Sequence, residues 1–218
     1  MSRLTISNID PHLLRLGILG GTFDPIHNAH LSKAAAVANA LAFDHVLFVP
    51  AGDPWQKPLP PVSGEHRLAM LTLATRHDPR FGVSRMEIDR PGPSYTVDTL
   101  RELRGLYGDR VRLFLVMGAD AYAGIGTWRE PEALFELAQL VVCARNGYPP
   151  PERHTAVTPV TLTVPEVSST AVRALVRRQV PVGHLVPAAV ESYIKAHGLY
   201  RETSSSTPWT ASATRSGL

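Results

Sequence analysis

Short apolar runs alternate with segments of helical periodicity between residues 15 and 197. Runs rich in Val, Leu and Ile predict strands, and apolar residues that recur every three to four positions predict helices. The predicted strands are residues 15–20, 45–50, 82–88, 111–117, 140–144 and 160–164. The predicted helices are residues 28–41, 64–77, 95–107, 131–137, 169–178 and 188–197. This alternation is typical of βαβ units with a parallel sheet between two layers of helices.

The pattern predicts an α/β fold: a Rossmann-like, doubly wound, mostly parallel sheet with helices on both faces. We expect one domain over residues 13–202, with a small helical C-terminal subdomain at about 169–202. Residues 1–12 are predicted to be a flexible leader, and the Ser/Thr-rich residues 203–218 a disordered tail. Such a sheet binds its ligand where the loops after the first and fourth strands meet.

Composition narrows the class of protein. The chain has 218 residues, of which 44% are hydrophobic and 19% are charged, as in soluble globular proteins. Lys and Arg exceed Asp and Glu by 22 to 19, and no basic run is longer than Arg177-Arg178, which argues against nucleic-acid binding. The single cysteine, Cys143, excludes internal disulfides and cysteine-based zinc sites. Since no apolar stretch is long enough for a membrane span or a signal peptide, we expect a cytoplasmic protein with no membrane partner.

The loop after the first strand, GGTFDPIHNAH over residues 20–30, carries the strongest chemical signal. Gly20 and Gly21 permit a tight turn and a close approach of ligand to backbone. The helix predicted from Asn28 directs its free N–H groups and its positive dipole end into the crevice, which favours an anion such as phosphate. His27 and His30 would share one face of the first turn and could donate to one phosphate.

A single histidine near a helix start is usually a surface or capping residue, but two of them beside a glycine pair at this turn favour ligand binding. Neither GxxxxGK[ST] nor GxGxxG occurs at this turn, so the loop would bind phosphate in another way.

A second candidate segment, VSSTAVR, covers residues 167–173. Ser168, Ser169 and Thr170 could cap the following helix while offering hydroxyl and N–H groups to a triphosphate. Arg173 follows Ser169 by one turn and would face the same way. Taken alone, the segment is better explained by an ordinary helix cap followed by an exposed arginine.

GGTFDPIHNAH resembles the GGxFDPxHxGH signature of the nucleotidyltransferases that share the HxGH motif with class I aminoacyl-tRNA synthetases, with Ala29 in place of the usual glycine. VSSTAVR is similar to their ISSTxIR segment. The resemblance implies that His27, His30, Lys57 and Arg173 are catalytic, with Lys57 near the β and γ phosphates. It implies ATP binding by Gly20, Gly21, Thr22, Phe23, His27, His30, Lys57, Ser168, Ser169, Thr170 and Arg173.

Three further segments resemble the bacterial nicotinate-mononucleotide adenylyltransferases. VPAGDPWQK (49–57) is similar to VPxxxPPHK but departs from it at Trp55-Gln56, GPSYTVDTL (92–100) is close to GPSYTxDTL, and MGAD with the later Trp128-Arg129 is like the family's GxD and tryptophan. By this resemblance Thr96 helps to recognise the pyridine carboxylate, Asp120 holds a ribose hydroxyl, and Trp128 stacks on the nicotinate ring. The implied mononucleotide site comprises Gly21, Thr96, Gly118, Asp120, Trp128 and Arg145, the last near the phosphate.

The resemblance implies the transfer of AMP from MgATP to nicotinate mononucleotide, giving nicotinate adenine dinucleotide and pyrophosphate. The acceptor phosphate is already anionic, so neither a general base nor a covalent intermediate is needed. Mg²⁺ would enter with ATP and bridge its phosphates, since the sequence shows no compact carboxylate cluster that would form a protein cage. The metal ligands and the oligomeric state, including a homo-oligomer, stay open.

Several alternatives remain at this point. Phosphopantetheine enzymes of the superfamily usually carry threonine at the position of His27 and lack the GPSYTxDTL segment, which disfavours that acceptor. Nicotinamide mononucleotide stays open as an acceptor, because loop hydrogen bonds decide between the two pyridines. A non-catalytic nucleotide sensor or an NAD-dependent oxidoreductase is disfavoured, since the four predicted catalytic residues are all present and no dinucleotide fingerprint occurs.

Overall fold

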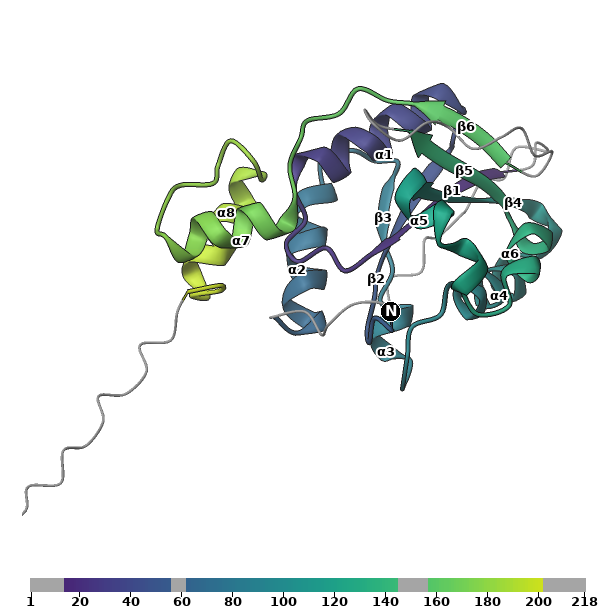
Figure 1. Cartoon of the computed structure of the whole chain (residues 1–218), viewed down its shortest axis with the longest axis horizontal. Coiled ribbons are helices and arrows are strands. Elements are labelled where there is room, and N and C mark those ends of the chain that lie inside the picture. Colours follow the sequence, from purple (N-terminus) through teal and green to yellow (C-terminus); the bar gives the residue numbers. More distant parts are fainter. Residues whose placement is uncertain (1–13, 56–61, 145–156, 202–218) are drawn as a thin grey trace, which may run out of the picture.

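A computed structural model describes residues 14–55, 62–144 and 157–201. Its six strands form one sheet in the order β3-β2-β1-β4-β5-β6, and every strand pair within these residues is parallel (Figure 1). The strands are β1 (Leu14–Gly21), β2 (His45–Pro50), β3 (Phe81–Val83), β4 (Val111–Gly118), β5 (Gln139–Ala144) and β6 (Val157–Thr161). The helices are α1 (Asn28–Ala40), α2 (Gly64–Thr75), α3 (Met86–Asp89), α4 (Thr96–Tyr107), α5 (Ala119–Ala123), α6 (Pro131–Leu137), α7 (Ser169–Arg177) and α8 (Ala188–Ala196), with 3-10 turns at Gly108–Arg110 and Ile125–Thr127.

Helices cover both faces of the sheet, as the alternation along the strands requires. On one face, side chains such as Leu19, Phe48 and Phe114 pack with α1, α2, α7 and α8. On the other face, neighbours in the same strands, such as Ile18 and Leu115, pack with α4, α5 and α6. Neighbouring residues of one strand are thus buried in different clusters, one on each face of the sheet. The predicted Rossmann-like, doubly wound fold is confirmed.

The chain leaves the central strand β1 in one direction and returns in the other, which creates the switch point of the sheet. From β1 it winds through β2 to β3, and then crosses to β4, β5 and β6 on the opposite side of β1. The loops after β1 and β4 therefore diverge from adjacent strand ends, and side chains from both can face one crevice.

Two predicted strands were wrong in their extent. The third strand ends at Val83, and the chain turns into α3, because Ser84 Oγ accepts the N–H of Met86 at 3.3 Å and the buried Glu87 accepts the hydroxyl of Thr99 at 2.6 Å. Apolar residues at 83, 86 and 88 imitate a strand pattern there. The sixth strand covers Val157–Thr161 instead of 160–164, because it stops opposite Ala144, where its neighbour β5 ends.

The C-terminal helices join the main core. Val172 of α7 and Val190 and Ile194 of α8 belong to the same buried cluster as α1 and α2. The predicted leader at 1–12 and tail at 203–218 lie outside the described residues, as do Lys57 and Arg145. Among the described helices, none is long and apolar enough to cross a membrane.

Candidate active site

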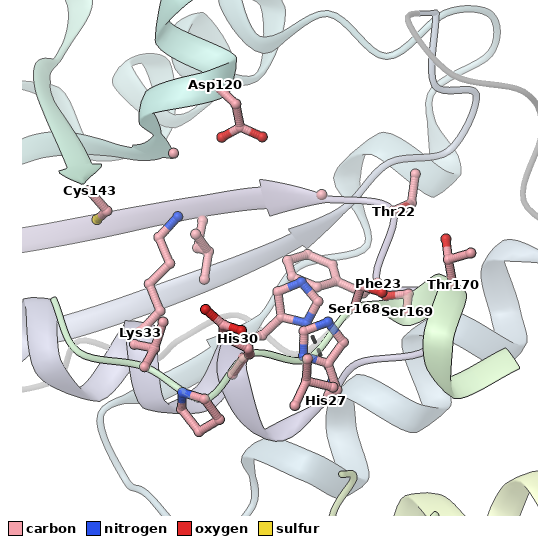
Figure 2. A pocket seen from close by; sticks show the side chains of 18 of the residues that line it. Thr22, Phe23, His27, His30, Lys33, Asp120, Cys143, Ser168, Ser169 and Thr170 are labelled. Carbon is pink, nitrogen blue, oxygen red and sulfur yellow. Dashed lines mark hydrogen bonds between the residues drawn. The ribbon is translucent and has the colours of Figure 1, made fainter. Parts of the chain in front are cut away.

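A cleft of about 1160 Å³ opens at the carboxyl ends of β1, β4 and β5, between α1 and the start of α7 (Figure 2). It is the crevice expected at the switch point. The residues that line it and that the sequence predicted are Gly20, Gly21, Thr22, Phe23, His27, His30, Gly118, Asp120, Ser168, Ser169, Thr170 and Arg173. Segments separated by more than a hundred residues in the sequence thus meet around one space.

In the β1–α1 loop, the backbone is accessible at Gly20 and is held in a fixed conformation at Phe23. A Cβ atom on Gly20 would meet nothing within 4 Å, so a ligand can approach this backbone closely. Phe23 adopts a positive φ of 49°, which L residues other than glycine rarely adopt. Its ring is buried edge-on against Phe48 and His30, with centroid distances of 5.8 and 5.1 Å. Packing therefore holds a backbone conformation that costs energy, as is common in ligand-binding loops.

The two histidines lie together at the start of α1, as their spacing predicts. Their rings stack with centroids 3.7 Å apart and planes 23° apart. The backbone N–H of His27 donates to Nδ1 of His30 at 3.4 Å. A nitrogen that accepts a hydrogen bond carries no proton, so in this arrangement the neutral His30 ring carries its proton on Nε2. That nitrogen is a hydrogen-bond donor.

His27 is neutral at physiological pH. Its side chain is only 4% exposed, and burial lowers its pKa to about 4 because the charged form would lose its hydration. Its Nδ1 is buried and has no hydrogen-bond partner among the described residues. His27 therefore acts as a polar donor or acceptor, with no positive charge of its own at pH 7.

Side chains at the start of α7 are hydrogen-bonded to the β1–α1 loop. Ser168 caps the helix, since its Oγ accepts the N–H of Ala171 at 3.1 Å. Ser169 Oγ donates to the carbonyl of Pro25 at 2.9 Å, and Arg173 Nη1 donates to the carbonyl of Asp24 at 2.8 Å. The predicted common orientation of Ser169 and Arg173 is confirmed. Both side chains hold the loop, and both line the cleft.

Sequence reasoning missed several polar residues behind and inside the cleft. Arg67 of α2 is 1% exposed and donates to the carbonyls of Thr22 at 2.8 Å and Gly52 at 3.4 Å. A charged residue at a buried position of a helical pattern was an available signal for it. Lys33 lines the cleft one turn beyond His30, and the same three-residue spacing that relates His27 to His30 points to it.

Asp24 and Tyr200 are a second pair that was missed. The carboxylate of Asp24 is 2% exposed, and the hydroxyl of Tyr200 donates to it at 2.6 Å. Asp24 stands inside the GGTFDP sequence, which gives a signal, whereas Tyr200 lies far from every recognised segment. No sequence pattern joins two residues that are 176 positions apart.

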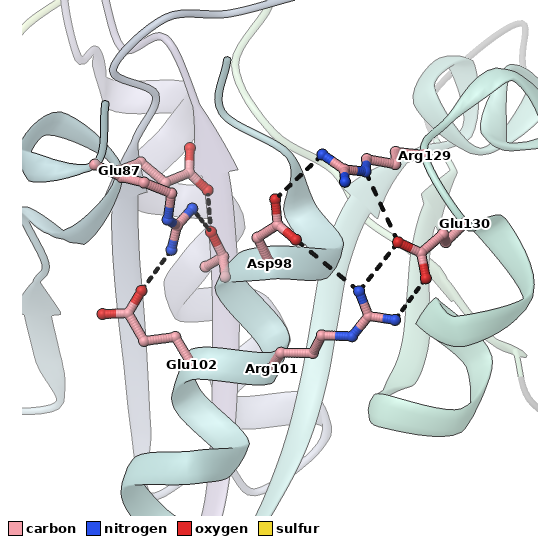
Figure 3. Close-up of polar contacts among 8 residues, drawn as sticks. Glu87, Asp98, Arg101, Glu102, Arg129 and Glu130 are labelled. Atoms are coloured by element: carbon pink, nitrogen blue, oxygen red, sulfur yellow. Dashed lines mark hydrogen bonds and ion pairs between the residues drawn. The ribbon is translucent and has the colours of Figure 1, made fainter. Parts of the chain in front are cut away.

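The segments assigned to the second substrate also converge. Ser94 Oγ accepts the N–H groups of Gly52 and Asp53, at 2.9 and 3.2 Å, which ties the loop after β2 to the GPSY segment. The guanidinium of Arg129 lies 4.8 Å from the centre of the Tyr95 ring, and it pairs with Asp98 (Figure 3). These contacts bring the turn that holds Trp128 beside the start of α4, which holds Thr96.

Thr96 and Trp128 are half-buried and are not among the residues that line the cleft as described. Their roles toward the mononucleotide stay predictions, as do those of Lys57 and Arg145, which lie outside the described residues.

Comparisons with known proteins agree with this geometry. The family model for cytidylyltransferase-like proteins matches residues 18–175. A relative from Thermus thermophilus with the name "Probable nicotinate-nucleotide adenylyltransferase" is 51% identical over 86% of this chain and all of its own length. A relative of the same name from Salinispora tropica is 46% identical over 84% of this chain and all of its own length.

Among solved structures, the fold matches the nicotinic acid mononucleotide adenylyltransferase of Plasmodium falciparum complexed with NaAD, with a TM-score of 0.74 and 19% identity over 86% of this chain and 97% of that one. At that identity the match speaks for the fold alone. The identity to the Thermus and Salinispora relatives, over the whole length of both, is what shows the family. The chain belongs to the cytidylyltransferase-like family and, within it, to the nicotinate-nucleotide adenylyltransferases.

Proposed function

We propose that the cleft transfers the adenylyl group of MgATP to the phosphate of nicotinate mononucleotide, releasing pyrophosphate and nicotinate adenine dinucleotide. The observation that carries the proposal is the stacked histidine pair at the N-terminal end of α1, in one cleft with Arg173. Neutral donors, helix N–H groups and one guanidinium around one space suit a polyphosphate whose charge shifts during the reaction.

The histidines would act by donating hydrogen bonds to the reacting phosphate. His30 offers its Nε2 proton, and His27, kept uncharged by burial, adds a second polar contact without a proton-transfer step. Arg173 would stabilise the departing pyrophosphate, and the hydroxyls of Ser168 and Thr170 would bind the triphosphate. We expect Lys57 to assist at the β and γ phosphates. Catalysis is then positioning and charge stabilisation.

The state of the thiol that lines the cleft agrees with a direct transfer that has no covalent enzyme intermediate. Cys143 lines the cleft and is 6% exposed. Burial raises the pKa of its thiol, and nearby Lys33 only partly opposes this, so the sulfur stays protonated and is a poor nucleophile. The attacking atom is better supplied by the acceptor, whose phosphate oxygen is already an anion.

Mg²⁺ would enter as the MgATP complex. Among the described residues, no three His, Cys, Asp or Glu side chains are grouped so that they could hold a metal ion. We expect Mg²⁺ to be held mainly by phosphate oxygens and water, as is usual for this ion. When bound, the ion would neutralise part of the phosphate charge.

The acceptor would occupy the region between the end of β4 and the joined loops around Tyr95 and Arg129. Gly118 and Asp120 line the cleft at that end, and Asp120 would accept a ribose hydroxyl. Thr96, Trp128 and Arg145 would complete the site for the pyridine ring and the phosphate. Nicotinamide mononucleotide is the alternative acceptor.

The test is turnover of purified protein with ATP, Mg²⁺ and either mononucleotide. We expect pyrophosphate release to match dinucleotide formation one to one, with the higher kcat/KM for nicotinate mononucleotide. A higher kcat/KM for the nicotinamide form would reassign the acceptor. No turnover at any magnesium concentration would favour a nucleotide sensor. We further infer that the enzyme works on these small molecules in the cytoplasm, in keeping with a chain that has one cysteine and no membrane-length apolar run.

A further inference from the structure

The carboxylate of Asp24 lies where the β1–α1 loop meets side chains from α2, from α7 and from the segment after α8. It is 2% exposed, and its Oδ1 accepts the hydroxyl of Tyr200 at 2.6 Å. Its Oδ2 is buried and has no hydrogen-bond partner among the described residues. A buried carboxylate with one donor is costly to hold, since each missing hydrogen bond leaves desolvation uncompensated.

Two arginines flank this carboxylate, and both donate hydrogen bonds to backbone carbonyls of the loop that contains it. Arg173 of α7 donates to the carbonyl of Asp24 itself, and Arg67 of α2 donates to the carbonyl of Thr22. Burial raises the pKa of Asp24, while the Tyr200 hydroxyl, then Arg173 and Arg67, act in the opposite direction. These three side chains, from the chain after α8, from α7 and from α2, are the groups that oppose the protonation of Asp24.

We propose that the Tyr200–Asp24 hydrogen bond is a clasp that positions the β1–α1 loop and Arg173 for the reaction, which makes Tyr200 a positioning residue of the active site. The inference rests on the proposed function and adds a residue to it that no motif contains. Tyr200 is 8% exposed and is not among the residues that line the cleft, so it acts through Asp24 and has no ligand contact of its own.

Loss of the Tyr200 hydroxyl would change the placement of the residues that contact the reacting phosphates. Without it, Asp24 either takes up a proton or draws Arg173 away from the carbonyl that now orients it. His27 follows Asp24 by three residues through the Asp24-Pro25 bond and Ile26, so a shift of the loop reaches the histidine pair. Transition-state contacts depend on placement more steeply than ground-state binding does, so kcat should change more than the KM for ATP.

Tyr200→Phe tests the clasp because it removes the hydroxyl and keeps the buried ring. Tyr193→Phe is the matched control: the Tyr193 hydroxyl lies 3.0 Å from Nδ1 of His66, so it also joins the C-terminal part to α2, but through His66 instead of Asp24. We expect kcat of Tyr200→Phe to fall about tenfold, with KM for ATP changed less than about threefold and with Tyr193→Phe close to wild type. The acid limb of the kcat–pH profile should move to higher pH in Tyr200→Phe alone, because Asp24 loses a donor that lowers its pKa.

Asp24→Asn closes the test. If the clasp acts through Asp24, the double variant Asp24→Asn/Tyr200→Phe should lose no more activity than Asp24→Asn alone. Wild-type kcat and an unmoved pH profile in Tyr200→Phe would overturn the inference. Equal losses in the two tyrosine variants without a pH shift would also overturn it, by assigning the effect to general stability. An inactive wild type would instead overturn the proposed function, and the inference with it.

Discussion

Two regions of this molecule are rich in charged side chains, and they use charge in opposite ways. On the surface of α4 and the turn before α6, Asp98, Arg101, Arg129 and Glu130 pair with one another (Figure 3), and side chains such as Arg101 and Glu130 are nearly half exposed. Around the β1–α1 loop, by contrast, the guanidinium groups of the buried Arg67 and the half-buried Arg173 donate to backbone carbonyls.

The difference lies in what remains available for a ligand. Exposed ion pairs neutralise each other and are screened by water, so they contribute little to stability and offer little to a phosphate. Around the cleft, a fixed backbone partner orients the charge of Arg173 without neutralising it, Arg67 holds the loop from behind the cleft, and His27 is neutral. Burial and backbone contacts, more than the number of charges, distinguish the candidate active site.

The largest expected effect comes from the cleft. His30→Ala removes a donor at the reacting phosphate, and kcat should fall by about 10² to 10³ or more while the fold stays intact. Steady-state pyrophosphate release, with thermal unfolding as a check on folding, measures this. His77→Ala, at an exposed histidine of the same chain, is the control and should keep wild-type activity. Near-normal turnover in His30→Ala would refute the assignment of the site.

The next effect concerns stability at low pH. The folded pKa of His27 is about 4, below its ordinary value of 6.5, so the unfolded chain takes up this proton first as pH falls. Stability contributed by neutral His27 is present above pH 6.5 and is lost as pH falls toward 4, by roughly 3 kcal/mol at most. Urea unfolding at pH 7 and pH 4.5 should show a smaller loss in His27→Gln than in the wild type. An identical loss in both proteins would show that His27 is not buried and neutral.

A smaller effect is expected from Arg173→Lys. Arg173 reaches the Asp24 carbonyl and Thr170 Oγ1 with two nitrogens, at 2.8 and 3.3 Å, and an ammonium cannot reproduce that fork. We expect kcat to fall about ten- to a hundredfold. Arg177→Lys, at the exposed last turn of α7, is the control and should leave kcat unchanged. If both substitutions have the same effect, retained positive charge alone would account for the role of Arg173.

The smallest effect belongs to the paired surface. Arg101→Ala breaks the pair with Glu130, in which both side chains are nearly half exposed. The free energy of unfolding should fall by no more than about 1 kcal/mol, and kcat should not change. Denaturant titration and turnover at two salt concentrations measure both. A large loss of activity would contradict the contrast drawn between the two regions.

The sequence predicted what repeats along the chain or matches a local pattern. It placed the sheet, its switch point, the histidine pair and the Ser168 cap correctly, because each depends on residues a few positions apart. It extended the third strand into α3, because the apolar spacing around Met86 imitates alternation. It missed Arg67 and Tyr200, whose roles depend on contacts across 45 and 176 positions and on burial that only the fold creates.

Direct transfer of an adenylyl group between two nucleotides distinguishes the proposed reaction from a route through a protein-bound intermediate. The most direct measurement follows ATP labelled at the α phosphate with nicotinate mononucleotide and the wild-type protein. We predict that the label appears in the dinucleotide, in step with unlabelled pyrophosphate, and never on the protein. Label on the protein, or label that stays in ATP while the mononucleotide is present, would contradict it.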